Sequence, residues 1–246
     1  MGLFITLILG LFILIGALIS FFSEQNKKFI NFSVGLAFSV ITLLVILELI
    51  PHTLETLNEV NSSINSVFIL ILFSLAGIVL LKIFDKLIPD HDTDDEHNLE
   101  HIGLLTSIAL VLHNIIEGMA VCNITNVSFS SGLLISIGVG LHNIPLGMIV
   151  ASTIYEGNKD KKKTSIIVVL ISLSTFLGGL LMMFVQDYFT ISFQGIILSI
   201  TLGMLVFISL FELLPKIIKI KDKSSVAKGM LLGIVMISLA LIFHHH

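Results

Sequence analysis

The stretch "LHNIIEGMAVCNI" at residues 112–124 places His113, two asparagines and Glu117 inside an apolar run. A second stretch, "LHNIPLGMIVAST" at 141–153, repeats its beginning, but Leu146 stands where the first copy has Glu117. Polar and ionisable side chains inside a membrane are costly and rare, and they usually mark a functional site. The repeated phrase therefore predicts a membrane bundle with a polar site between two of its helices.

The composition supports a membrane protein. Of 246 residues, 55% are hydrophobic and 12% are charged, which is more apolar and less charged than a soluble domain. The only cysteine, Cys122, excludes a disulfide framework and a cysteine zinc site. A net charge of −4 gives no reason to expect a nucleic acid partner. The apolar composition makes the lipid bilayer the expected surroundings. The last three residues, 244–246, are interpreted as the remnant of a purification tag.

Eight apolar runs are long enough to cross a bilayer, which takes about 20 residues in a helix. Because the bilayer core has no water to satisfy the backbone, all eight should be helical. We expect an all-α integral membrane protein, with one transmembrane domain over residues 1–246. The predicted spans are 3–22, 30–50, 64–84, 102–122, 131–154, 165–186, 189–213 and 226–243.

The positions of the basic residues predict the orientation. All 13 are lysines, and they lie in or next to the loops that follow spans one, three, five and seven. The positive-inside rule places these loops in the cytoplasm and both termini outside.

A second pair of motifs accompanies the first. Span two ends in "LELIPH" (47–52) and span seven ends in "FELLPK" (211–216), and the predicted topology gives these spans opposite orientations. Spans four and five, which carry the first pair, are also antiparallel. Inverted repeats with a site near the bilayer midplane are typical of transporters.

Three side chains of the repeated phrase form a candidate metal site. His113 and Glu117 are four residues apart and so share one helix face. Together with His142 on the next span they are ligands suited to Zn²⁺ or another divalent metal. Structural hydrogen bonds between helices are the simpler interpretation. An intramembrane zinc hydrolase could use the same set, but the chain has no H-E-x-x-H motif and the repeats would then be unexplained.

These motifs resemble the paired metal-binding signatures of the ZIP family (Zrt- and Irt-like proteins), and the chain resembles a divergent prokaryotic member. The resemblance covers the span count, the orientation and both motif pairs. It implies two three-helix units, related by an inverted repeat, that enclose spans four and five (3+2+3). It also implies transport of zinc, iron, manganese or cadmium toward the cytoplasm of the cell, across the plasma membrane and without an organic cofactor. A homodimer is one of the oligomeric states left open.

Matched by position, the family's first metal site falls on His113, Glu117 and His142, and its second on Asn114, Glu117 and Asn143. The family usually has a proline where this chain has Ile116, and carboxylates where it has Leu146 and Thr175. Because only Glu117 remains of the three carboxylates, we expect a single-metal site. The same loss leaves open a non-transporting metal sensor or scaffold.

Other polar residues are candidates for the pathway. Glu48, Glu212 and His52 would compensate the charge of the ion or gate the path if they point inward, and otherwise they are solvated near the interface. The loop 89–101 after span three contains His91, His97 and His101 with six acidic residues. We interpret it as a cytoplasmic loop that accepts released metal, and the alternative is a solvated acidic loop.

Overall fold

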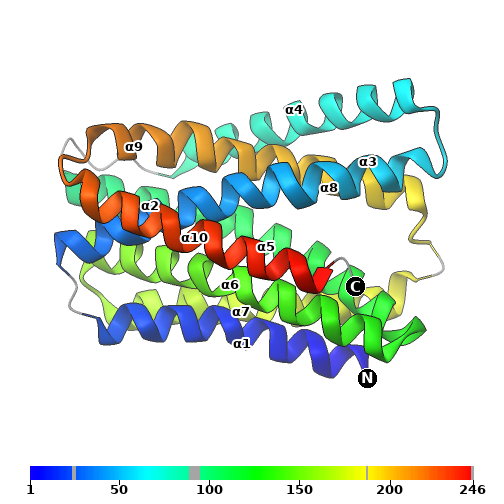
Figure 1. Cartoon of the computed structure of the whole chain (residues 1–246), viewed down its shortest axis with the longest axis horizontal. Helices are drawn as coiled ribbons and strands as arrows, with labels where there is room; N and C mark the ends of the chain where they lie inside the picture. The colour runs from blue at the N-terminus through cyan, green and yellow to red at the C-terminus, as the bar shows by residue number, and fades with distance from the viewer. Residues whose placement is uncertain (24–25, 89–94, 187, 245–246) are drawn as a thin grey trace.

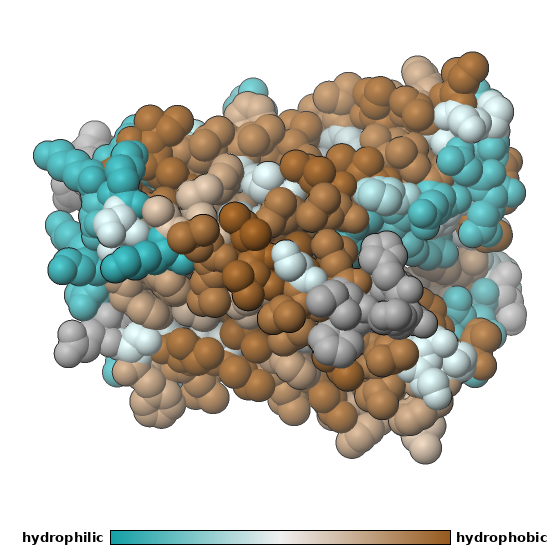
Figure 2. Space-filling view, viewed as in Figure 1, coloured by the Kyte–Doolittle hydropathy of each residue, from teal (hydrophilic) through white to brown (hydrophobic). Residues whose placement is uncertain are grey.

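The computed structural model describes residues 1–23, 26–88, 95–186 and 188–244. Within these residues the chain is helical without strands, and eight helical stretches are long and apolar enough to cross a membrane. The predicted fold class, an all-α membrane protein with eight spans, is thus confirmed. Figure 1 shows the helices lying side by side along the long axis of the molecule. Figure 2 shows hydrophobic residues over the middle of one face, with hydrophilic residues gathered at both ends.

Six of the spans are single helices: α1 (Gly2–Phe22), α4 (Ser63–Leu87), α5 (Asp95–Val127), α6 (Phe129–Asn158), α7 (Lys161–Val185) and α10 (Lys223–His244). Polar residues begin several helices by capping free backbone N–H groups. Asn26 accepts a hydrogen bond from the backbone of Phe29, and Asp160 accepts two from the first turn of α7. Helix α6 continues through Pro145 without a break.

Spans two and seven are each built from three consecutive segments. Span two comprises α2 (Lys27–Leu44), the π-helical segment η1 (Val45–Leu49) and α3 (Ile50–Asn58). Span seven comprises α8 (Ile191–Phe207), the π-helical segment η2 (Ile208–Leu213) and α9 (Leu214–Lys219). In both, a proline follows the π-helical segment at the second residue of the next helix. Proline donates no backbone hydrogen bond and crowds the carbonyl four residues earlier, so a wider turn just before it accommodates this local conflict.

The helices of these two spans extend beyond the predicted spans. We expected spans two and seven to end at residues 50 and 213, and the helical stretches continue to Asn58 and Lys219. Glu48 and Glu212 consequently lie inside continuous helical stretches, within the π-helical segments.

The helices pack in pairs that reproduce an inverted repeat. Helix α1 packs on α6 as α7 packs on α5, and α2 packs on α10 as α8 packs on α4. This arrangement relates spans one to three to spans six to eight, and α5 to α6. Helices α1, α5, α6 and α7 pack against one another, and α6 also contacts α2 and α10. The core at these contacts is apolar and includes Leu146, Ile149 and Ile154 of α6.

Each of the four helix pairs is closed by two glycines in reciprocal contact with backbone. In every case a Cβ on one glycine would overlap the carbonyl oxygen of the residue three positions before its partner glycine. Small residues let helix backbones approach closely, and the close Cα–H···O contacts add to the attraction. The glycine pairs are Gly16 with Gly147, Gly118 with Gly178, Gly35 with Gly229, and Gly77 with Gly203.

Candidate metal centre

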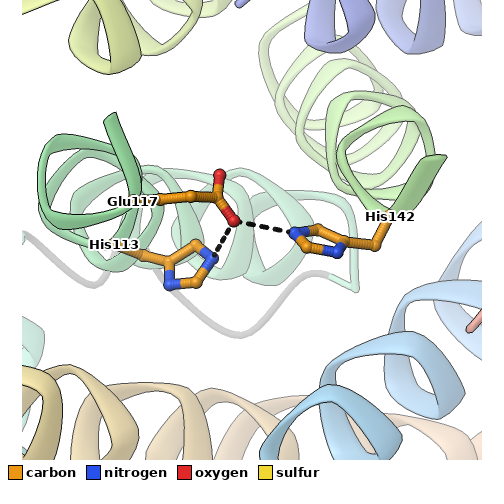
Figure 3. A group of neighbouring side chains, drawn as sticks. All are labelled: His113, Glu117 and His142. Carbon is orange, nitrogen blue, oxygen red and sulfur yellow. Dashed lines mark hydrogen bonds and ion pairs between the residues drawn. The ribbon is translucent and has the colours of Figure 1, made fainter. Parts of the chain in front are cut away.

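A cluster of two imidazoles and one carboxylate lies between α5 and α6. His113 is the middle residue of the membrane-spanning stretch Leu99–Val127, and His142 lies next to the centre of Phe129–Asn158. Figure 3 shows His113 and Glu117 projecting from one helix toward His142 on its neighbour. One ligand atom from each of the three residues can be chosen so that all lie within 4.8 Å of one another. Among the described residues, no other group of three or more His, Cys, Asp or Glu side chains has this geometry.

Glu117 is the centre of this cluster. His142 Nε2 donates a hydrogen bond to Glu117 Oε1 over 3.0 Å, and His113 Nε2 lies 3.6 Å from the same oxygen, which is too long for a hydrogen bond. The two imidazole rings have centroids 6.3 Å apart. His113 and His142 are 5% and 1% exposed, so both are shielded from solvent. Donor atoms that converge in this way, in an apolar bundle, can hold a divalent cation between the helices.

The two asparagines of the repeated phrase have different surroundings. Asn143 Nδ2 donates to Glu117 Oε2 over 3.4 Å, so Asn143 belongs to the cluster. Asn114 Nδ2 donates instead to the carbonyl of Ile171 on α7 over 3.3 Å. The side-chain oxygens of both asparagines are buried without a hydrogen-bond partner. Buried polar atoms are normally paired, and unpaired acceptors at this position fit a bound cation.

The positions that lack the family's carboxylates are buried. Leu146 is 1% exposed and belongs to the main apolar core. Thr175 is fully buried, and its hydroxyl has no hydrogen-bond partner. These residues bring no charge to the bundle, so Glu117 is the only acid in the cluster that the described residues form.

The outer candidates fall into two groups. Glu48 is half-buried, and its carboxylate lies within electrostatic range of His142. His52 and Glu212 are also half-buried, and both take part in interactions. The sequence interpretation missed the hydrogen bond of 2.6 Å between Thr42 and Ser209. This bond links α2 to η2 in the bundle interior, and single hydroxyls in apolar runs gave no signal for it.

The predicted acceptor loop is shorter than expected. Helix α5 begins at Asp95, so residues 95–101 are helical, and His97 lies in its first turn. His101 lies in α5, and its Nε2 donates to Asp85 Oδ1 of α4 over 2.8 Å. His91 lies outside the described residues. A polar segment next to an apolar span can continue its helix when a partner such as Asp85 accepts a hydrogen bond from one of its side chains.

The fold and the buried donor cluster define a multi-pass membrane protein with a candidate metal centre inside its helix bundle. The family described as "ZIP Zinc transporter" matches residues 86–243. The chain belongs to this family, whose members are transporters rather than enzymes. The alternative of an intramembrane hydrolase therefore has no support. The prediction that the protein is not an enzyme is confirmed.

Curated relatives cover the chain almost completely. It is 30% identical over 255 residues to a "Zinc transporter ZupT" of Chlorobium chlorochromatii, covering 97% of this chain and 95% of the relative. It is 32% identical over 251 residues to a protein of the same name from Streptococcus mutans, with the same coverage. A third, from Clostridium perfringens, is 30% identical over 271 residues and covers 98% of this chain and 95% of the relative.

Proposed function

We propose that this protein carries Zn²⁺ across the cell membrane, one ion at a time, through a site formed by His113, Glu117 and His142. The observation that supports this most is the convergence of these three buried side chains from two adjacent helices. The names of the relatives, which are called zinc transporters, support zinc as the cargo. Iron, manganese and cadmium are the alternative cargoes that the same donors could hold.

The donor set suits a transported ion. Zn²⁺ takes four ligands, of which the two imidazoles and Glu117 would supply three and the Asn143 oxygen or a water the fourth. With neutral imidazoles and one carboxylate, the bound ion keeps a net positive charge in a medium of low dielectric constant. This charge weakens binding, and transport needs an ion that can also leave.

The lysine distribution supports an orientation and a direction. Helices that alternate in direction place the loops after spans one, three, five and seven at one end, and all 13 lysines belong to this end. The positive-inside rule makes it the cytoplasmic end, with both termini outside. Uptake toward the cytoplasm is the proposed direction, with His91, His97 and His101 assisting release. The proposed unit of transport is the single chain, and a homodimer is compatible with it.

Zinc uptake into proteoliposomes, read with an encapsulated zinc-sensitive dye, tests this function. We expect uptake by the parent protein and none by Glu117→Gln, because the substitution removes the only carboxylate of the cluster. Zinc binding measured by calorimetry in detergent should also be lost. Glu55→Gln, the same change at an exposed position, is the matched control and should leave both unchanged.

Two results would contradict the proposal. If Glu117→Gln binds zinc as tightly as the parent, the site lies elsewhere. If the parent binds zinc through Glu117 but shows no uptake of any of the four metals, the chain is a metal sensor or scaffold.

A further inference from the structure

A pocket of about 600 Å³ opens at the lysine-rich end of the molecule, away from the metal centre. Its walls are the start of α2, the end of α9 and the connection from α9 to α10, and its inner side includes Leu99 of α5 and Glu156 of α6. Leu99 and Glu156 each lie fourteen residues along their helix from the histidine of the metal centre, which is about 21 Å. The pocket is therefore a separate site.

Basic side chains dominate the lining of this pocket. Two separate stretches of the chain, 27–28 and 216–221, contribute five lysines, which are Lys27, Lys28, Lys216, Lys219 and Lys221. Lys27, Lys219 and Lys221 are exposed, and none of the three forms an ion pair with another described residue. Five like charges around one cavity repel one another, so the empty pocket is electrostatically unfavourable and an anion would stabilise it.

The two acids of the lining are already engaged by other groups. Glu156 Oε2 pairs with Lys159 Nζ over 2.7 Å, and Lys159 does not line the pocket. Asp222 accepts hydrogen bonds from the side chain and the backbone of Ser225 over 2.6 and 3.2 Å. Asp222 also lies within electrostatic reach of Lys28. The acids thus offset only part of the positive charge.

The pocket also has apolar surface that a small inorganic ion would not use. Ile30, Val34, Leu99 and Ile220 contribute to the lining. Ile218 of α9, between Lys216 and Lys219, is 67% exposed, and Phe211 of η2 is 57% exposed. Figure 2 shows hydrophilic residues next to hydrophobic ones at the end of the molecule where α9 passes into α10. A charged cavity beside exposed apolar side chains fits a ligand with an anionic head and hydrocarbon chains.

From these features we propose that this pocket binds the phosphate headgroup of an anionic phospholipid. The lysines hold the phosphate, and the acyl chains lie along the exposed apolar side chains of η2 and α9. Basic pockets between membrane helices on the cytoplasmic side are suited to such headgroups, because anionic lipids are enriched in that leaflet. A free phosphate or a soluble phosphate ester shares the head chemistry but would gain nothing from the apolar surface.

Native mass spectrometry of the full chain in detergent, titrated with short-chain lipids, tests the proposal. We expect the parent to bind short-chain phosphatidylglycerol and to bind phosphatidylcholine much more weakly. The triple variant Lys27→Gln/Lys219→Gln/Lys221→Gln should bind phosphatidylglycerol at least about tenfold more weakly, since each lysine near an anionic lipid contributes roughly fivefold. The matched control Lys82→Gln/Lys86→Gln/Lys162→Gln removes the same charge from exposed positions outside the pocket and should keep the parent affinity.

The outcomes distinguish the sources of the phosphate. The lipid assignment is supported if inorganic phosphate does not displace phosphatidylglycerol at concentrations well above that of the lipid. It is overturned if inorganic phosphate binds as tightly as the lipid, because the ligand is then a soluble anion. Equal losses in the two triple variants would also overturn it, since they would reflect net charge rather than the pocket. The midpoint of thermal unfolding without lipid, measured for all three proteins, verifies that the variants are folded.

Discussion

Glu117 carries the negative charge of the candidate metal centre alone, and this determines how the site behaves. A dication between two neutral imidazoles and one carboxylate keeps a net positive charge, which is costly in an apolar bundle. Glu48 of η1 lies within electrostatic range of His142 but is not one of the three clustered side chains. The buried Leu146 and Thr175 add no charge. The site should therefore hold one ion, and hold it loosely enough to release it.

The substitution Leu146→Glu tests this charge balance. It places a carboxylate four residues after His142, as Glu117 follows His113, and α6 would then offer the same pair of donors as α5. We expect tighter zinc binding, by tenfold or more for about 1.4 kcal/mol of added attraction, and a second bound ion. Zinc uptake should become slower, because a tightly held ion leaves less readily. Calorimetry gives the affinity and the number of ions.

Leu146→Gln is the matched control, because glutamine has the shape of glutamate without its charge. This variant should bind zinc as the parent does. Leu146 packs in the main apolar core rather than against lipid. If Leu146→Glu binds no better than Leu146→Gln, the side chain at this position points into packing and not toward the ion.

The histidines near the start of α5 should affect release and not binding. Replacing His91, His97 and His101 with serine is expected to slow zinc uptake without abolishing it, and to leave the affinity of the metal centre unchanged. His101 contributes separately, because it joins α5 to Asp85 of α4. His101→Ser alone should therefore lower the thermal unfolding midpoint, whereas His91→Ser/His97→Ser should not. A complete loss of uptake in the triple variant would make these residues part of the main site.

At the scale of the helices, the reciprocal glycine contacts explain how eight apolar spans select their partners. Hydrophobic burial gives no preference inside a membrane, where lipid is as apolar as the helix surface, so close backbone packing takes its place. The same reciprocal contact occurs in all four pairs, with the carbonyl always three residues before the partner glycine. One local geometry thus serves both halves of the inverted repeat.

A single methyl group tests the importance of these contacts. In Gly203→Ala the new Cβ would overlap the carbonyl oxygen of Ser74 on α4, and backbone cannot move aside without separating the helices. We expect a loss of roughly 1–3 kcal/mol of stability, seen as a lower thermal unfolding midpoint in detergent. Gly195→Ala in the same helix is the comparison, because its Cβ would meet the Cδ2 and Cγ atoms of the Leu57 side chain and no backbone atom, so that only side-chain packing has to change. Equal losses in the two variants would contradict a special role for backbone contact.

The sequence predicted the helices better than their ends. Runs of apolar residues require helices in a bilayer, and the repeated His-Asn phrases predicted which two helices carry the donors. The continuation of spans two and seven through Pro51 and Pro215 was not predictable in this way, because proline normally ends a helix and the compensating π-helical turn has no signature in composition. The pocket at α9 was missed for another reason. Its lysines were explained by topology alone, and only the structure brings the separate stretches 27–28 and 216–221 around one cavity.

For the whole molecule, the helix packing treats the two ends alike, whereas the lysine distribution distinguishes them. The packing of α1 to α4 is repeated, upside down, by that of α7 to α10. The charge does not follow this symmetry, because every lysine belongs to one end. The repeat therefore suits a centre that can be reached from either side, while in the proposed orientation the lysines mark the side that faces the cytoplasm.

The proposed orientation predicts which loops react with a thiol reagent that cannot cross the membrane. Cys122, the only cysteine, is buried and can be replaced by alanine to give a cysteine-free background. Ser62 is exposed between α3 and α4, at the end opposite the lysines. In this background Ser62→Cys should be labelled in intact cells, and Lys162→Cys, exposed at the start of α7, only after the cells are opened. The reverse pattern would place the lysine-rich end outside, which would also move the phospholipid pocket to the outer leaflet.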